Sequence, residues 1–422
     1  MGLAKSVEYA MFGLISVIML LWGFIEGLSP VTRSLDLFFF VVRISTIEAL
    51  YSSIGFSLTT LFACFLLYKE LHLGEKREPV NNSDPVEAIV PVYRDHNVLH
   101  KSVESLQQSN YNDLRINVVC EEGDERSIEA AEKLDCEVVI NKYPGSKAGA
   151  INTVFEERDS KYFAIFDADE VVSEDFIGHG IGYLKGTKYM VFQGRRVPIP
   201  DGLVEKFSYC ERAIFHAAYK LQGLLGFPYA KSSSTILTDE AWEKANGYDD
   251  MLTEDIDFAH KCWRHDIPVK SDRRYTNLME APHTWKDFWN QRKRWLMGVV
   301  QIFHKGLKRD YRESPRRKEV FSLLRSFFSF TFPILILILF SNFFVLVVLG
   351  LQVFYLLPIL VTALAPIIVS ASDRKIEGID FIGFFSLFTF IILLVSGLIA
   401  LKAALEYVFS WNGEWYLVEK GK

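Results

Sequence analysis

The stretch "FAIFDADEVVSEDF" (Phe163 to Phe176) decides the fold, because an apolar run passes directly into a group of carboxylates. Its opening residues have the apolar and aromatic composition of a buried strand. Asp167, Asp169 and Glu170 follow at once. Ligands of open α/β sheets bind at the carboxyl ends of the strands. The stretch therefore predicts a ligand site, with Asp167 and Asp169 on one side of the strand and Glu170 pointing away.

Segments of strand and helix character alternate through the residues before this stretch. Expected strands cover residues 86–92, 115–120, 136–140 and 162–166, and expected helices cover residues 98–109, 125–134 and 147–157. This alternation is typical of βαβ units, in which helices cover both faces of a mostly parallel sheet. The predicted fold class is therefore an α/β domain of Rossmann-like character.

Acidic residues gather where the predicted strands end. Glu121, Glu122 and Asp124 follow the second strand, as Asp167 and Asp169 follow the fourth. Carboxylates that lie together repel one another unless a cation joins them. Mg²⁺ and Mn²⁺ prefer oxygen ligands, and Mg²⁺ usually keeps substrate phosphates as partners. We therefore expect a Mg²⁺ or Mn²⁺ ion that holds the diphosphate of a ligand.

Long uncharged runs lie on both sides of the predicted domain. The chain is 50% hydrophobic, although 23% of its residues are charged. The uncharged runs cover residues 9–25, 49–68, 326–372 and 381–401. Because a bilayer core needs about 20 helical residues, they predict two transmembrane helices before the α/β domain and about three after it. The first run is interpreted as a retained anchor, since no convincing cleavage site follows it.

The distribution of charge predicts how the chain is oriented. Residues 285–318 hold 11 Lys and Arg against 3 Asp and Glu. Positive charge beside membrane spans marks the cytoplasmic side, so we expect a multi-pass protein of the cell membrane with a cytoplasmic α/β domain. The predicted divisions are 1–70 (two transmembrane helices), 71–284 (the cytoplasmic domain), 285–320 (amphipathic interface helices with Arg292, Lys293 and Lys305 as basic positions), 321–410 (about three transmembrane helices) and 411–422 (a tail).

The side of the C-terminus stays open at this point. Three spans after the domain would place the C-terminus outside. The tail "WNGEWYLVEKGK" (residues 411–422) resembles the Trp-rich, Lys-ending tails of some membrane glycosyltransferases, which lie in the cytoplasm. The two expectations conflict.

Six motifs in order resemble those of membrane-embedded family 2 glycosyltransferases of the processive type, which have a GT-A fold. They are "VPVYRD" (90–95), "VVCEEGD" (118–124), "KAGAIN" (147–152), "FDAD" (166–169), "TED" (253–255) and "QRKRW" (291–295). In the first motif, Arg94 and Asp95 replace the usual Asn-Glu. The second departs from the usual Asp-Asp-Gly-Ser, which leaves open whether Glu121 or Glu122 reads the donor.

The resemblance implies a role for each motif. Asp255 is the expected general base, and the expected metal ligands are Asp169 and Asp167. The expected donor-binding residues are Tyr93, Asp95, Glu121, Lys147, Asp167 and Arg294, and the expected acceptor-binding residues are Glu254, Gln291 and Trp295. Together they imply inverting transfer of a hexose to a growing polysaccharide. A UDP-sugar is the favoured donor, with GDP-mannose next.

Several alternatives remain. The same motifs fit transfer of one sugar to a membrane lipid acceptor. The letters "DADEV" also fit the opening motif of haloacid-dehalogenase-type phosphatases, although several βα units precede them and "QRKRW" is then unexplained. A receptor or scaffold with an inactive nucleotide-binding domain is the third alternative. Membrane lipid is an expected partner, nucleic acid is not, and a homo-oligomer is left open.

Overall fold

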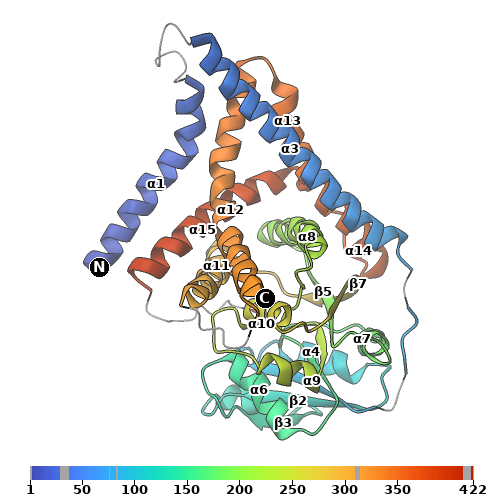
Figure 1. Ribbon diagram of the computed structural model, residues 1–422. Helices are drawn as coiled ribbons and strands as arrows, with labels where there is room; N and C mark the ends of the chain where they lie inside the picture. Colours follow the sequence, from blue (N-terminus) through green and yellow to red (C-terminus); the bar gives the residue numbers. More distant parts are fainter. Residues whose placement is uncertain are drawn as a thin grey trace.

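The computed structural model describes residues 2–28, 38–75, 77–81, 84–308, 314–411 and 420–421. An α/β domain forms one end of the molecule, and long helices rise from it (Figure 1). The strands are β1 (Val86–Val92), β2 (Leu114–Cys120), β3 (Glu137–Ile140), β4 (Tyr162–Ile165), β5 (Val191–Pro198), β6 (Thr235–Thr238) and β7 (Val269–Met279). Helices of the domain are α4 (Leu99–Gln107), α5 (Glu125–Ala131), α6 (Lys147–Glu157), α7 (Phe176–Leu184), α8 (Leu203–Leu224), α9 (Asp239–Ala245) and α10 (Glu254–Arg264).

One sheet of seven strands organises the domain, in the order β3-β2-β1-β4-β6-β5-β7. The four strands predicted from the sequence pair in parallel, which confirms the predicted βαβ half. In the other half, β6 runs antiparallel to both β4 and β5, and β7 pairs in parallel with β5. The fold class is therefore confirmed as α/β, with one reversed strand inside the sheet.

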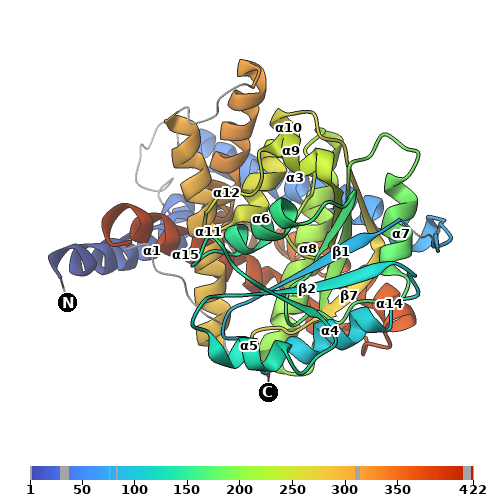
Figure 2. The ribbon, with the colours of Figure 1, turned by 90° about the horizontal axis from the view of Figure 1, so that it is seen from below.

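The sheet is buried on both faces. Ala88 and Val90 of β1 belong to the apolar core shared with α4 and α7, while Ile89 faces the core shared with α6 and α10. Figure 2, seen from the domain end, shows β1 and β2 with α6 on one side and α4 and α5 on the other. Because both faces are covered, the carboxyl ends of the strands are the open edge where polar side chains gather.

The remaining helices are long and apolar. They are α1 (Leu3–Leu28), α3 (Phe38–Leu73), α11 (Trp285–Leu307), α12 (Arg316–Val348), α13 (Gln352–Thr362), α14 (Leu364–Ile376), the 3-10 helix η1 (Gly383–Phe388) and α15 (Thr389–Phe409). Five stretches among the described residues are long and apolar enough to cross a membrane: Leu3–Trp22, Ala49–Leu73, Arg316–Val348, Gln352–Ile376 and Gly383–Phe409. Two precede the domain and three follow it, as the uncharged runs predicted.

A buried ion pair joins the domain to these helices. Arg195 of β5 donates through Nη1 to Asp373 of α14 at 2.9 Å, and both side chains are at most 1% exposed. The Tyr209 hydroxyl of α8 donates to the same carboxylate at 2.6 Å. Apolar residues of α3, α8, α12 and α14 pack around this contact in one core. The domain and the helices are therefore packed as one body.

Both ends of the last helix lie beside the domain. Phe385 of η1 packs edge-on against Phe207 of α8, with 5.1 Å between the ring centroids. At the other end, Glu406 of α15 lies 2.8 Å from Lys293 of α11. Farther along, Lys420 contacts the strand-end acids of the sheet. The described residue Lys420 of the C-terminal tail therefore lies beside the α/β domain.

Candidate active site

The acids that follow β4 lie in a turn and not along an extended strand. The strand ends at Ile165, and the Glu170 amide donates to the Asp167 carbonyl at 3.1 Å. The Asp167 carboxylate accepts from Lys147 of α6 through one oxygen and from Arg196 of β5 through the other. Burial raises the pKa of Asp167, but these two cations outweigh burial and hold it well below its usual range. Asp167 is therefore a fixed anion between two elements.

Asp169 contacts a different cation. Its Oδ1 lies 3.2 Å from the Lys420 Nζ, and the Asp95 Oδ2 lies 2.9 Å from the same nitrogen. Asp169 is only 3% exposed. Asp167 and Asp169 thus make their hydrogen bonds to different cations. Sequence reasoning missed Lys420, because nothing local links it to the sheet.

The structure contains only part of the metal site that the sequence predicts. Among the residues that the structure describes, no group of three or more His, Cys, Asp or Glu side chains is placed to hold a metal ion. Asp95 and Asp169 nevertheless converge on one positive charge. Two carboxylates suit a Mg²⁺-type ion, which is commonly bound by one or two carboxylates with phosphate and water as the other ligands.

Glu170 lies behind the turn, away from Asp169's cation, as the sequence predicted. Its carboxylate accepts from the Asp167 amide at 2.8 Å and from the Ser234 hydroxyl. Burial, reinforced by the neighbouring Asp167 charge, raises the pKa of Glu170 to about 7. Glu170 therefore supports the shape of the turn from within the domain.

A buried polar segment, Lys231–Thr235, connects the strand-end acids to α10. Ser232 donates through its hydroxyl to Glu254 at 2.7 Å, and its carbonyl accepts from the Lys147 ammonium at 2.8 Å. Lys147, which also contacts Asp167, lies 4.0 Å from Glu254. In the sequence, the segment is marked by four consecutive hydroxyl residues, Ser232 to Thr235, just before and at the start of a buried strand.

Asp255 lies in the first turn of α10, as its sequence predicted. Its Oδ1 accepts from the Ile256 amide at 2.7 Å, and its Oδ2 lies 3.2 Å from the Lys231 Nζ. Burial raises the pKa of Asp255, but Lys231 and Arg196 outweigh burial and lower it below its usual value. The carboxylate is therefore ionised near neutral pH. Burial raises the pKa of the adjacent Glu254.

Glu121, and not Glu122, is fixed in place at the end of β2. Glu121 accepts from the Asn141 amide group at 2.7 Å and from the Gly145 backbone amide at 2.9 Å, whereas Glu122 is exposed. Gly145 lies two residues before Lys147, so Glu121 is tied to the loop that positions Lys147 at the start of α6.

Tyr93 presents an open aromatic face at the end of β1. Its side chain is 41% exposed, and the Arg94 guanidinium lies 5.0 Å from the ring centroid. Arg94 has a left-handed backbone, with φ of +60°, and its amide donates to the Asp124 carboxylate at 2.8 Å. That contact stabilises a conformation that residues other than glycine seldom adopt. The turn thereby places one aromatic and one cationic group at the strand end.

The helix α11 brings the Gln-Arg-Trp motif to the same region. Arg294 donates to the Leu252 carbonyl at 3.3 Å, three residues before Asp255. The Trp295 ring has two guanidinium groups nearby, that of Arg212 at 4.7 Å and that of Arg292 at 4.8 Å. Through Leu252 and Arg212, α11 contacts the segment before α10 and the helix α8.

The basic positions of α11 pair with carboxylates of the protein. Arg292 is buried, donates to Glu211 of α8 at 2.7 Å and donates to the side-chain oxygen of Gln291. Lys293 pairs with Glu406 of α15, and Lys305 pairs with Asp257 of α10 at 3.3 Å. The helix lies between the domain and the apolar helices, so its cations meet protein carboxylates.

The predicted residues therefore fall into connected groups. Asp167, Lys147, Glu254 and Asp255 form one chain of contacts through Ser232 and Lys231, and Arg294 joins it through the backbone before α10. Asp95 and Asp169 share Lys420, Glu121 is attached through Gly145, and Tyr93 stands beside Arg94.

Sequence reasoning missed Arg196, whose signal was a charged pair inside an otherwise apolar strand.

Comparison with known proteins indicates which class of protein has a site of this kind. Residues 162–369 match the family described as glycosyl transferase family group 2. The probable glycosyltransferase YdaM of Bacillus subtilis is 23% identical over 283 residues, 62% of this chain and 66% of that protein. Poly-beta-1,6-N-acetyl-D-glucosamine synthase of Staphylococcus epidermidis is 28% identical over 179 residues, 41% of this chain and 42% of that protein. The chain thus spans less than two thirds of either relative.

A solved structure shows the same fold. The mannosyltransferase PcManGT from Pyrobaculum calidifontis, in complex with GDP-Man and Mn²⁺, superposes with a TM-score of 0.50 at 14% identity, over 86% of this chain and all of that one. The mixed sheet with acids at its strand ends is a GT-A glycosyltransferase fold, here joined to helices apolar enough to span a membrane. The matched residues 162–369 include the letters "DADEV", which favours the glycosyltransferase interpretation of these letters over the phosphatase one.

Proposed function

We propose that the protein is an inverting glycosyltransferase that moves a hexose from a nucleotide sugar to an acceptor hydroxyl at the membrane. The observation that carries the proposal is the chain of contacts from Asp167 through Lys147 to Glu254 and Asp255. Lys147 contacts both the strand-end acid Asp167 and Glu254, and Asp255 follows Glu254 at the start of α10.

The proposed base is Asp255. The acceptor oxygen attacks the anomeric carbon from the face opposite the diphosphate, and its proton passes to the Asp255 carboxylate. The bond from the anomeric carbon to the phosphate oxygen breaks, and the nucleoside diphosphate leaves with both electrons. Lys231, 3.2 Å away, keeps Asp255 ionised until the proton arrives. General-base catalysis of this type contributes about 10²–10⁴-fold to a rate.

Cationic side chains would stabilise the leaving diphosphate. Lys147 and Arg196 already hold the acid at the strand end, and Arg294 can pair with two phosphate oxygens. Tyr93 offers its open face to the donor base, and Glu121 would accept hydrogen bonds from base or ribose. Gln291, Trp295 and Glu254 are proposed for the acceptor side, since the flat indole of Trp295 suits a sugar ring.

A divalent ion, Mg²⁺ or Mn²⁺, is proposed at Asp169 and Asp95, with Asp167 nearby. The convergence of both carboxylates on one cation supports this choice, as does the Mn²⁺ bound by the structural neighbour of the same fold. When bound, such an ion neutralises the charge that develops on the departing phosphate. Asp95 joins the predicted ligands Asp169 and Asp167 in this proposal, because it shares Lys420 with Asp169.

For the acceptor, we propose a growing polysaccharide. The poly-beta-1,6-N-acetyl-D-glucosamine synthase relative supports that choice, and transfer of one sugar to a lipid is the second candidate. We further propose that the protein is a multi-pass protein of the cell membrane, with its domain and C-terminal tail in the cytoplasm. The contact of Lys420 with Asp95 supports placing the tail and the domain on one side.

A panel of nucleotide sugars, each with Mg²⁺ or Mn²⁺, tests the proposal through release of nucleoside diphosphate by the purified full chain. We expect one donor to be turned over and chelation by EDTA to stop release. Sizing of the product then separates a polymer from a single addition. Absence of turnover with every donor, in protein that binds none of them, would contradict the proposed function.

A further inference from the structure

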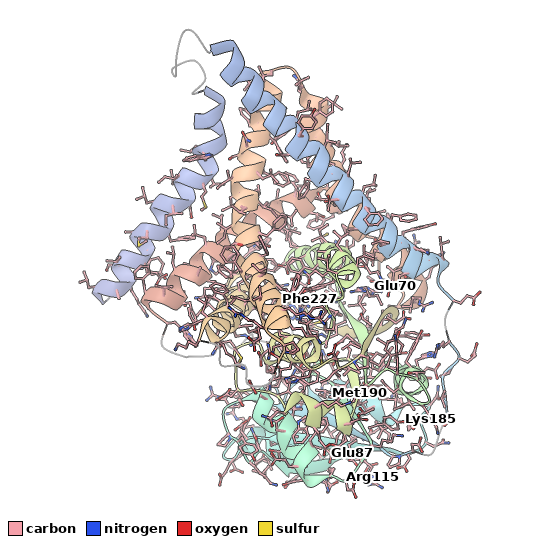
Figure 3. The ribbon with its side chains drawn as sticks, in the orientation of Figure 1. Glu70, Glu87, Arg115, Lys185, Met190 and Phe227 are labelled. Atoms are coloured by element: carbon pink, nitrogen blue, oxygen red, sulfur yellow. The ribbon has the colours of Figure 1, made fainter. Side chains whose placement is uncertain are left out.

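We propose that a cavity at the junction of the long helices and the domain binds the phosphate-bearing head group of an anionic membrane lipid. The cavity has a volume of about 800 Å³. Its walls are the end of α3, the end of α8, the loop after α10 and the start of β7. Figure 3 labels Glu70 and Phe227, two of its lining residues, at the level where the helices meet the α/β domain.

The position of the cavity places it at a membrane surface. Its lining includes Leu66 and Lys69, which lie in the last turns of the apolar stretch Ala49–Leu73. Leu224, another lining residue at the end of α8, is 62% exposed, and Leu73 beside the opening is 63% exposed. Exposed leucines beside a polar cavity suit a ligand that is apolar at one end and charged at the other.

The lining carries more positive than negative charge. Its cations are Lys69, Lys188, Lys220, Lys270, Arg273 and Arg274, and its carboxylates are Glu70, Asp266 and Asp272. Glu70 already pairs with Lys220 and Arg273, and Asp272 pairs with Arg274. Lys69, Lys188 and Lys270 have no carboxylate partner among the described residues. Basic pockets of this kind beside membrane helices bind anionic lipid head groups.

The cavity is separate from the proposed active site. None of the site residues proposed above is among the residues that line it. One link between the two is the segment Phe227–Lys231, in which Tyr229 lies in the cavity wall beneath Arg273 and Lys231 pairs with Asp255. Another is α10, which begins with Glu254 and Asp255 and lines the cavity with Cys262 and Trp263. The test therefore measures lipid binding rather than turnover, so failure of the glycosyltransferase proposal would leave its outcome intact.

The full-length protein, freed of lipid in detergent, is titrated with short-chain phosphatidylglycerol, with phosphatidylcholine and with inorganic phosphate, and bound ligand is counted by native mass spectrometry. We expect phosphatidylglycerol to bind in preference to phosphatidylcholine. Each basic residue near a membrane surface contributes about 1 kcal/mol, so Lys188→Gln with Lys270→Gln should weaken phosphatidylglycerol binding about 25-fold. Lys133→Gln, an exposed lysine after α5, is the matched control and should bind as the wild type does.

Three results would overturn the proposal. One is equal affinity for the two lipids, and another is unchanged binding in the double variant. The third is full displacement of the lipid by inorganic phosphate, which would assign the cavity to a free anion. Circular dichroism and thermal unfolding check that the double variant is folded. If it is not, the single variant Lys69→Gln, at an exposed position, should still show about fivefold weaker binding.

Discussion

Replacement of Asp255 by Asn tests the mechanism most directly. Asn has nearly the same shape but cannot accept the acceptor proton. Loss of a general base lowers a rate about 10²–10⁴-fold, which corresponds to about 3–5 kcal/mol of activation free energy. The affinity for the donor nucleotide should change little, since Asp255 contacts Lys231 and its own helix rather than the strand-end acids.

The same substitution has a second effect that the structure predicts. Lys231 is 12% exposed and Asp255 is 18% exposed, so Asp255→Asn leaves a largely buried ammonium without its partner. Removal of one partner from a buried pair costs about 3–5 kcal/mol, and we expect the lower end because both groups keep some contact with solvent. The double variant with Lys231→Met removes both charges. It should recover most of the thermal stability but none of the rate.

The assay compares initial rates of nucleoside diphosphate release with donor affinity measured by calorimetry. Asp249→Asn is the control, because it also removes a carboxylate from lysine partners, Lys261 and Lys305, but lies outside the proposed site. Turnover by Asp255→Asn within about threefold of the wild type would refute the assignment of Asp255 as the base. So would a loss of rate that donor affinity explains in full.

Three further predictions follow from contacts around the sheet. Lys420→Met should lower the Mg²⁺ concentration needed for half-maximal release of nucleoside diphosphate, because an ammonium no longer competes for the Asp95 and Asp169 carboxylates. An unchanged or higher Mg²⁺ requirement would contradict this prediction. Glu170 has a folded pKa of about 7, above its unfolded value, so its contribution to stability is present at low pH and lost as pH rises through 7. Glu170→Gln should therefore reduce the fall in melting temperature between pH 5 and pH 8, and an unchanged slope would count against the assignment. Arg195→Met leaves the Asp373 carboxylate buried without its guanidinium, so it should destabilise the protein by about 3–5 kcal/mol, seen as a lower melting temperature than in the Arg115→Met control at an exposed position.

The sequence correctly predicted the strands and helices that are specified by interactions between neighbouring residues. The expected strand 86–92 and helix 147–157 coincide with β1 and α6, because apolar periodicity and a Ser cap specify them within the segment. The same holds for Asp255 in the first turn of α10. The reversed strand β6 was not predicted, since its pairing with β4 and β5 depends on elements far away in the chain.

By itself, the sequence determined the class of the domain, the five apolar stretches and the acids that mark the strand ends. These follow from hydrophobic patterning, which acts over neighbouring residues. Only the tertiary structure decided what each acid contacts: Asp167 meets Lys147 and Arg196, while Asp169 meets Lys420, 251 residues away. An ion pair depends on which elements the topology brings within a few ångströms, and that information is spread over the whole chain.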